Sequence, residues 1–255
     1  MSTDPGTSGG WPDGVGRVIL DEIDSTNAEA ARRAPTLGGP TWIFTHRQTQ
    51  GRGRRGRAWT DPAGNFAATL VFKPNEPLRA VALNSFVAAI SLREALNALA
   101  PSDGYSLKWP NDVLLNGAKI AGILLESAGN AGQVDWLAIG IGVNLRAAPE
   151  AQAVEPGALR ASSVEAELGV RIDPLQLLDL LAINMDANRR LMQTAGFDAI
   201  RRIWLSHAAR RGEVITARTM RDEIRGTFED VDAEGNLILR TAGGEVAVTA
   251  ADVFF

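Results

Sequence analysis

Residues 51–65 read GRGRRGRAWTDPAGN, and this stretch decides whether the chain has a dinucleotide-binding fold. Its glycines at 51, 53 and 56 match the G-x-G-x-x-G pattern of dinucleotide-binding folds, in which the last glycine opens an amphipathic helix. Here the residues after Gly56 include the turn formers Asp61, Pro62 and Gly64, and they show no helical period. No Gly-Lys-Ser/Thr follows either, so a P-loop is also excluded. The stretch therefore predicts a loop in a fold that is neither a dinucleotide-binding fold nor a P-loop fold.

This arginine loop, residues 51–57, contains Arg52, Arg54, Arg55 and Arg57 and no acidic residue. Glycine lets main-chain N–H groups approach an anion closely, and guanidinium groups bind carboxylate or phosphate oxygens two at a time. The loop predicts a ligand with several negative charges, and a solvated basic loop is the alternative that this stretch alone leaves open. A nucleic-acid binder that relies on bulk charge is disfavoured, because the net charge is −4.

The composition excludes several other classes of site. There are no cysteines, which excludes disulfides, thiolate metal sites and a cysteine nucleophile. Only His46 and His207 could supply imidazole, so a histidine-rich metal site or a Ser-His-Asp triad is poorly supported. Residues 1–15 predict a disordered tail, and no apolar run approaches the ~18 residues of a membrane span. We expect a cytoplasmic protein with no membrane contact.

The pattern along the chain predicts an α+β fold in which helices pack on a mixed β-sheet. A capping box of Thr26 and Glu29 would begin a short helix that Pro35 ends, and Asn116-Gly117 predicts a hairpin within 112–126. Further strands are expected at 17–23, 41–47, 65–73 and 135–145, and helices at 78–100, 163–168, 174–194 and 197–209.

Short strands are then expected at 213–218, 224–231, 237–241 and 245–249. Short alternating strands of this kind predict a small β-barrel. We therefore expect two domains, 16–210 and 211–255.

Five motifs occur in order along the first domain. They are Asp24-Ser25-Thr26-Asn27, the arginine loop, Lys108-Trp109-Pro110-Asn111-Asp112, Lys119-Ile120-Ala121-Gly122-Ile123-Leu124 and Gly140-Ile141-Gly142-Val143-Asn144. In this order they resemble the biotin protein ligases, by motif from Asp21 to Asn144 and by layout to the C-terminus. The resemblance implies a class II synthetase-like catalytic domain followed by a small SH3-like barrel.

The resemblance also implies an activity. Members of that family convert biotin and MgATP to biotinyl-5′-adenylate and pass the biotinyl group to a lysine of a biotin carboxyl carrier domain. A carboxylate must then attack the α-phosphorus of ATP, so cations have to screen two anions that repel each other. The surplus of Arg and Lys in the five motifs suits that chemistry.

Site residues are assigned by the same resemblance. The expected catalytic residues are Lys119, Arg54 and Lys108. The expected biotin-binding residues are Ser25, Thr26, Asn27, Gln48, Arg52, Gly53, Arg54, Lys119, Gly122, Gly140 and Gly142. The expected ATP-binding residues are Arg52, Arg54, Arg55, Arg57, Trp59, Lys108, Asn111, Asp112 and Asn144, with Asp112 as a ligand of Mg²⁺.

Simpler readings of these residues are also open. Ser25 and Thr26 could serve simply as helix caps, and Gly122, Gly140 and Gly142 could mark bulges in strands. Trp59 could belong to the apolar core. A lipoate or octanoate ligase is the nearest rival activity, and a noncatalytic nucleic-acid binder is the rival from another class. Because the catalytic pattern starts close to Met1, we expect no helix-turn-helix domain and no sequence-specific DNA binding, while a homodimer is left open. We also expect the arginine loop to be mobile until an anionic ligand orders it.

Overall fold

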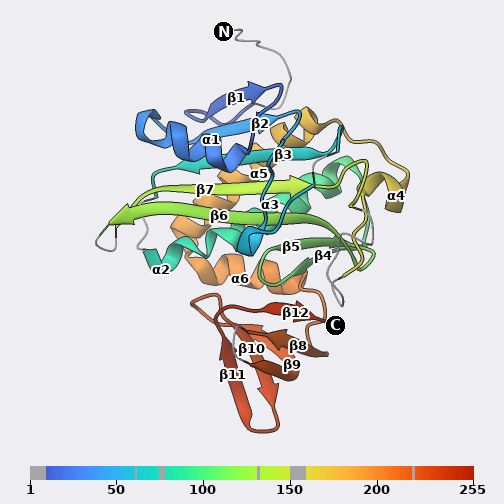
Figure 1. Cartoon of the computed structure of the whole chain (residues 1–255). Helices are drawn as coiled ribbons and strands as arrows, with labels where there is room; N and C mark the ends of the chain where they lie inside the picture. Colours follow the sequence, from blue (N-terminus) through green and yellow to red (C-terminus); the bar gives the residue numbers. More distant parts are fainter. Residues whose placement is uncertain (1–9, 61, 75–77, 131–132, 150–158, 220–221) are drawn as a thin grey trace.

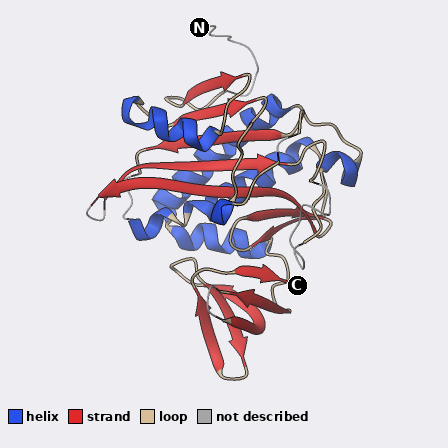
Figure 2. Cartoon of the chain, viewed as in Figure 1, coloured by secondary structure: helices blue, strands red, loops and turns tan. Residues whose placement is uncertain are grey.

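The computed structural model describes residues 10–60, 62–74, 78–130, 133–149, 159–219 and 222–255. Two β-sheets organise this part of the chain, and helices cover the larger one (Figures 1 and 2). The predicted α+β class is confirmed.

The large sheet has seven strands in the order β1-β2-β3-β7-β6-β5-β4. It is mixed, because β1 and β2 run parallel and the other neighbouring pairs run antiparallel. Every residue of β2 and β3 is buried, so helices or loops cover both faces there. The strands are β1 (Gly16–Leu20), β2 (Thr41–Thr45), β3 (Phe66–Phe72), β4 (Tyr105–Lys108), β5 (Asp112–Leu115), β6 (Ala118–Asn130) and β7 (Gln133–Val143).

The helices divide between the two faces of this sheet. Helix α1 lies across β2, β3 and β7 on one face, whereas α3 and α5 pack together on the other (Figure 1). The helices are α1 (Thr26–Arg33), α2 (Leu78–Val81), α3 (Asn84–Leu99), α4 (Val164–Leu168), α5 (Pro174–Ala195) and α6 (Phe197–Ser206), with 3₁₀ turns η1 (Ala34–Thr36) and η2 (Arg54–Gly56).

The single helix expected at 78–100 is wrong, because α2 and α3 are separate. The amide of Asn84 donates to the carbonyl of Val81 at 3.2 Å. A side chain that takes a backbone carbonyl in this way competes with the helical hydrogen bond, and the chain turns at that point.

The predicted hairpin is confirmed between β5 and β6. Asn116 and Gly117 both have positive φ, 50° and 76°, as a primed two-residue turn requires. The turn pairs Leu114 with Lys119, and a shift of register between Leu114 and Val113 then brings Asp112 of β5 opposite Gly122 of β6.

The second sheet has five antiparallel strands in the order β11-β10-β9-β8-β12. The small C-terminal β-domain that the sequence predicts is therefore present, but its sheet does not close, because β11 and β12 are opposite edges and no pairing joins them among the described residues. The strand β12 was not foreseen, since three residues at the chain end carry no readable alternation. The strands are β8 (Val214–Arg218), β9 (Glu223–Val231), β10 (Leu237–Thr241), β11 (Gly244–Val248) and β12 (Asp252–Phe254).

The two sheets share one continuous apolar core. Trp204 of α6 contacts Phe228 of β9, with ring centroids 6.4 Å apart, and the indole N–H of Trp109 donates to the carbonyl of Gly235 at 3.0 Å. These contacts fix the small sheet against the large one. As a result the C-terminal strand β12 lies beside the large sheet (Figure 1).

Residues 1–9 of the expected tail lie outside the described residues. The expected tail extends too far at its other end, because Trp11 packs against the core and its indole N–H donates to the carbonyl of Val15. Among the helices that are described, none combines the length and the apolar composition of a membrane span.

Candidate active site

A cleft of about 530 Å³ brings the sequence motifs together over β6 and β7. Every predicted site residue except Arg55 lines it. These residues are Ser25, Thr26, Asn27, Gln48, Arg52, Gly53, Arg54, Arg57, Trp59, Lys108, Asn111, Asp112, Lys119, Gly122, Gly140, Gly142 and Asn144.

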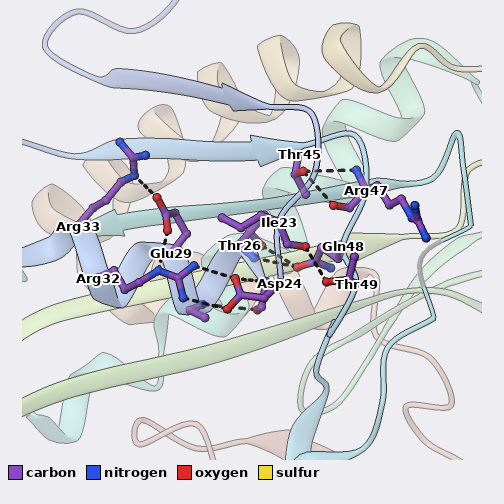
Figure 3. Close-up of polar contacts among 12 residues, drawn as sticks. Ile23, Asp24, Thr26, Glu29, Arg32, Arg33, Thr45, Arg47, Gln48 and Thr49 are labelled. Atoms are coloured by element: carbon purple, nitrogen blue, oxygen red, sulfur yellow. Dashed lines mark hydrogen bonds and ion pairs between the residues drawn. The ribbon is translucent and has the colours of Figure 1, made fainter.

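One end of the cleft is polar and formed by the start of α1. The backbone N–H of Thr26 donates to Gln48 Oε1 at 2.9 Å, and the Thr26 hydroxyl lies 3.2 Å from the same oxygen (Figure 3). Behind them, the fully buried hydroxyl of Thr69 lies 2.8 Å from Thr26 Oγ1 and 2.7 Å from Asn27 Oδ1. Short polar side chains are therefore held in fixed positions at this end.

The N-cap of α1 is Ser25, so the predicted capping box of Thr26 and Glu29 is wrong. The backbone N–H of Ala28 reaches Ser25 Oγ at 3.5 Å, while the Thr26 hydroxyl is occupied inside the cleft. Glu29 instead binds Arg32 at 2.7 Å, and Arg32 also binds Asp24 (Figure 3). This hydrogen-bonded arginine lowers the pKa of Asp24 to about 2. The ion pairs hold the first turn of α1 in place.

Glycines make the floor of the cleft flat. Gly122 pairs with Gly142 and Leu124 pairs with Gly140 in a regular ladder, so these glycines are not bulges. A Cβ on Gly140 would lie 2.3 Å from Asn27 Oδ1, and one on Gly142 would lie 2.5 Å from the Trp59 ring. The expectation that something approaches the backbone here is confirmed, and the neighbours are side chains of the chain itself.

Two buried polar atoms of the cleft have neither a hydrogen-bond partner nor an ion-pair partner among the described residues. They are the indole N–H of Trp59 and Oδ1 of Asn144. The Asn144 amide is fixed because its N–H donates to the carbonyl of Ser162 at 3.0 Å. Since a buried polar group without a partner costs about 1–3 kcal/mol, these two atoms are suited to meet a polar ligand.

The opposite end of the cleft is cationic and centred on Asp112. Lys119 Nζ lies 2.6 Å and Lys108 Nζ 3.6 Å from the carboxylate oxygens of Asp112. Burial would raise the pKa of Asp112, but the two lysines outweigh burial and the pKa is lowered. Burial lowers the pKa of Lys108, and Asp112 opposes that effect. Asp112 therefore holds two ammonium groups together in a nearly dry site.

The arginine loop crosses the cleft as an ordered turn. Arg55 adopts a positive φ of 56°, and the N–H of Gly53 donates to the carbonyl of Arg57 at 2.7 Å. Arg54 donates to Asn111 Oδ1 at 3.3 Å, and burial lowers its pKa. Arg54 is therefore partly buried, whereas Arg52, Arg55 and Arg57 are exposed.

The small sheet also contributes to the cleft, which the sequence did not reveal. Asp252 of β12 accepts from Arg55 at 2.6 Å and from Arg57 at 3.0 Å, and Val253 and Phe254 line the cleft beside it. Thr69 was missed as well, although a single polar residue inside the apolar run FAATLVF was a readable signal.

The donor set does not fit a magnesium ion held by the protein at Asp112. The described residues contain no group of three His, Cys, Asp or Glu side chains that could hold a metal. The oxygens of Asp112 already face two ammonium groups. Mg²⁺ would therefore enter the cleft with ATP, bound to its phosphates.

Comparison with known proteins identifies the family. Residues 16–144 match the biotin/lipoate A/B protein ligase family and residues 212–255 match the biotin protein ligase C terminal domain. The chain is 52% identical to the biotin–[acetyl-CoA-carboxylase] ligase of Paracoccus denitrificans over 93% of this chain and 99% of that protein. It is 30% identical to the bifunctional ligase/repressor BirA of Bacillus subtilis, over 92% of this chain and 73% of that protein.

The fold agrees with this assignment. A biotin protein ligase from Aquifex aeolicus, solved in complex with biotin and ATP, superimposes with a TM-score of 0.80 at 24% identity, over 93% of this chain and 97% of that one. The chain belongs to the biotin/lipoate A/B protein ligase family.

Proposed function

We propose that the protein is a biotin ligase, which activates biotin with MgATP and transfers the biotinyl group to a lysine of a biotin carboxyl carrier domain. One observation carries the proposal: a single cleft joins a polar end suited to a small polar ring with a cationic end suited to phosphate and carboxylate. The glycine floor between them leaves a flat path for an aliphatic tail.

The polar end would hold the ureido ring. Ser25, Thr26, Asn27 and Gln48 offer several hydrogen-bonding groups within one turn of α1 and the adjacent loop. The tail would run across Gly140 and Gly142, which are about 7 Å apart along β7. The carboxylate of the tail would then reach Lys119, whose ammonium group would lie 3.6 Å from a Cβ on Gly122 and so faces the floor of the cleft.

The cationic end would bind ATP. In the first step a carboxylate oxygen of biotin attacks the α-phosphorus and pyrophosphate leaves, while Lys119, Lys108 and Arg54 screen both anions. Arg52, Arg55, Arg57 and Asn111 would bind the remaining phosphate oxygens. The unpartnered atoms of Trp59 and Asn144 would meet polar atoms at the adenosine end.

In the second step the lysine amine of the carrier attacks the carbonyl carbon of the mixed anhydride. AMP leaves with the bonding electrons, and the amine loses a proton as the amide forms. The cations that bound the α-phosphate also stabilise the leaving AMP, so one cluster serves both steps.

Two contacts must change before ligands occupy these positions. The Trp59 ring lies directly on Gly142, where the tail would pass. Asp252 forms ion pairs with Arg55 and Arg57, and these would have to break before the two arginines bind phosphate. Arg55 and Arg57 belong to the arginine loop and Trp59 follows it by two residues, so this segment would have to move when biotin and ATP bind.

A lipoate or octanoate ligase is the second candidate, because the family matched by residues 16–144 includes lipoate ligases. The match of residues 212–255 and the polar end of the cleft favour biotin. Pyrophosphate release in the presence of MgATP and biotin, lipoate or octanoate separates the candidates. We expect release with biotin alone, and release with lipoate alone would contradict the proposal.

A further inference from the structure

Two side chains that do not line the cleft both contact Asn27, which does line it. Thr69 lies on β3 and is fully buried, and Glu126 lies on β6, on the same face as Gly122 and Leu124. Neither residue has a place in the chemistry proposed above. Their contacts determine which way the hydrogen bonds at the polar end run.

Glu126 fixes the orientation of the Asn27 amide. Asn27 Nδ2 lies 2.8 Å from Glu126 Oε2 and 3.4 Å from the carbonyl oxygen of Leu124, and both of these oxygens are acceptors. A flipped amide would place its own oxygen against a carboxylate oxygen at that distance. Asn27 Oδ1 therefore faces Thr69 Oγ1 at 2.7 Å.

The direction of the next bonds follows from counting protons. A hydroxyl has one proton to donate, and an amide oxygen can only accept. The Thr69 proton must therefore go to Asn27 Oδ1, since otherwise two acceptors would meet at 2.7 Å. Thr26 Oγ1, 2.8 Å from Thr69 Oγ1, then has to donate to Thr69.

The resulting chain runs from Thr26 through Thr69 and Asn27 to Glu126. Gln48 Oε1 lies farther from Thr26 Oγ1, at 3.2 Å, and already accepts from the Thr26 backbone. If the Thr26 proton went to Gln48, the oxygens of Thr26 and Thr69 would meet at 2.8 Å without a proton between them, so the Thr26 proton is assigned to Thr69 and the Thr26 oxygen keeps a lone pair for the cleft. Thr26 is thereby an acceptor towards a ligand.

We propose that Glu126 and Thr69 are positioning residues that make this end of the cleft selective for a ring with an N–H donor. This inference rests on the proposed function and deepens it. The cyclic urea of biotin offers N–H groups to Thr26, whereas a dithiolane ring or an alkyl chain offers none. Selection between the substrates of the family then depends on two residues that never touch the substrate.

Glu126 also connects the polar end to the arginine loop. Its other oxygen, Oε1, lies 3.6 Å from the guanidinium of Arg52. One carboxylate therefore touches both the residue that orients the ring site and a residue of the loop.

The test measures dissociation constants of biotin and ATP by calorimetry for two matched pairs of variants. Thr69→Val keeps the shape and removes the hydroxyl, while Thr69→Ser keeps the hydroxyl. Glu126→Leu removes the acceptor of Asn27, while Glu126→Gln retains one. We expect the dissociation constant for biotin to rise at least about tenfold in Thr69→Val and Glu126→Leu. It should stay near the wild-type value in Thr69→Ser and Glu126→Gln, and the dissociation constant for ATP should be unchanged in all four variants.

A biotin analogue methylated on its ureido nitrogens supplies a readout that a structural role would not move. The analogue should bind the wild-type protein much more weakly than biotin. The ratio of the two dissociation constants should be smaller in Thr69→Val, because the Thr26 hydroxyl is no longer oriented to accept from the ureido N–H in that variant. An equal penalty in both proteins would overturn the inference, as would wild-type biotin affinity in both Thr69→Val and Glu126→Leu. Failure of the wild-type protein itself to bind biotin would instead overturn the proposed function.

Discussion

Replacing Asp112 by asparagine should destabilise the protein strongly, because this carboxylate neutralises two ammonium groups that lie close together in a nearly dry site. The side chains of Asp112 and Lys108 are 9% and 11% exposed and that of Lys119 is 33% exposed. Removing one partner of a buried ion pair costs about 3–5 kcal/mol. Because Lys119 can turn towards solvent, we expect the lower end, about 3 kcal/mol of unfolding free energy.

Urea unfolding of wild-type protein and Asp112→Asn measures this loss, and Asp24→Asn is the matched control. Asp24 has a comparably short ion pair, 2.7 Å to Arg32, but its side chain is 37% exposed, so solvent screens the interaction that lowers its pKa. Exposed pairs contribute about 0–1 kcal/mol, so the control should remain close to wild type. Equal losses in the two variants would refute the reasoning that burial makes the Asp112 cluster costly to break.

The same comparison has a defined dependence on pH. The pKa of Asp112 is lowered in the folded protein, so its stabilisation is complete above the ordinary aspartate pKa of about 3.9 and disappears as the pH falls through the lower folded pKa. The stability difference between wild type and Asp112→Asn should therefore be constant near neutral pH and shrink below about pH 4. A difference that grows on acidification would contradict the assignment.

Three further predictions concern the cleft. Lys119→Ala should reduce the rate of adenylate formation by at least about a hundredfold, which is the loss expected for a group that stabilises transition-state charge. The variant should stay folded, as its thermal midpoint would show, and an unchanged rate would remove Lys119 from the chemistry. Limited proteolysis at Arg52, Arg54, Arg55 and Arg57 should slow when biotin and MgATP are both present, whereas equal cleavage with and without them would count against ordering of the loop. Gly142→Ala should alter tryptophan fluorescence and weaken biotin binding more than Gly122→Ala, because its Cβ would lie 2.5 Å rather than 3.3 Å from the Trp59 ring, and equal effects would show that the ring moves freely.

Much of the site could be predicted because its signals are local. Asn116-Gly117 specifies a turn by backbone sterics alone, and that turn pairs Lys119 with Leu114 next to the cleft. The shift of register that follows, which places Gly122 opposite Asp112, carried no local signal. The four arginines of the arginine loop, with no acidic residue among them, predicted an anion-binding site. The flat floor followed from Gly140 and Gly142, since a glycine inside a strand marks a close approach.

The contacts that the sequence could not predict join residues far apart in the chain. Ser25 and Thr26 both carry a hydroxyl, and only Gln48 and Thr69 decide which of them caps the helix. Nothing local relates Asp252 to Arg55, although the two side chains meet at 2.6 Å.

Errors in the fold have a similar origin. The break between α2 and α3 depends on how Asn84 uses its amide, not on a glycine or proline. Strand β12 was missed because its place is set by pairing with β8 and not by a pattern within its three residues.

Intact-mass analysis of a biotin carboxyl carrier domain tests the central claim most directly. The carrier is incubated with this protein and MgATP in parallel tubes that contain biotin, lipoate or octanoate. We predict the gain of one biotinyl mass in the biotin tube alone. A lipoyl or octanoyl adduct without a biotinyl one would contradict the proposed function, and so would an unmodified carrier with no pyrophosphate released.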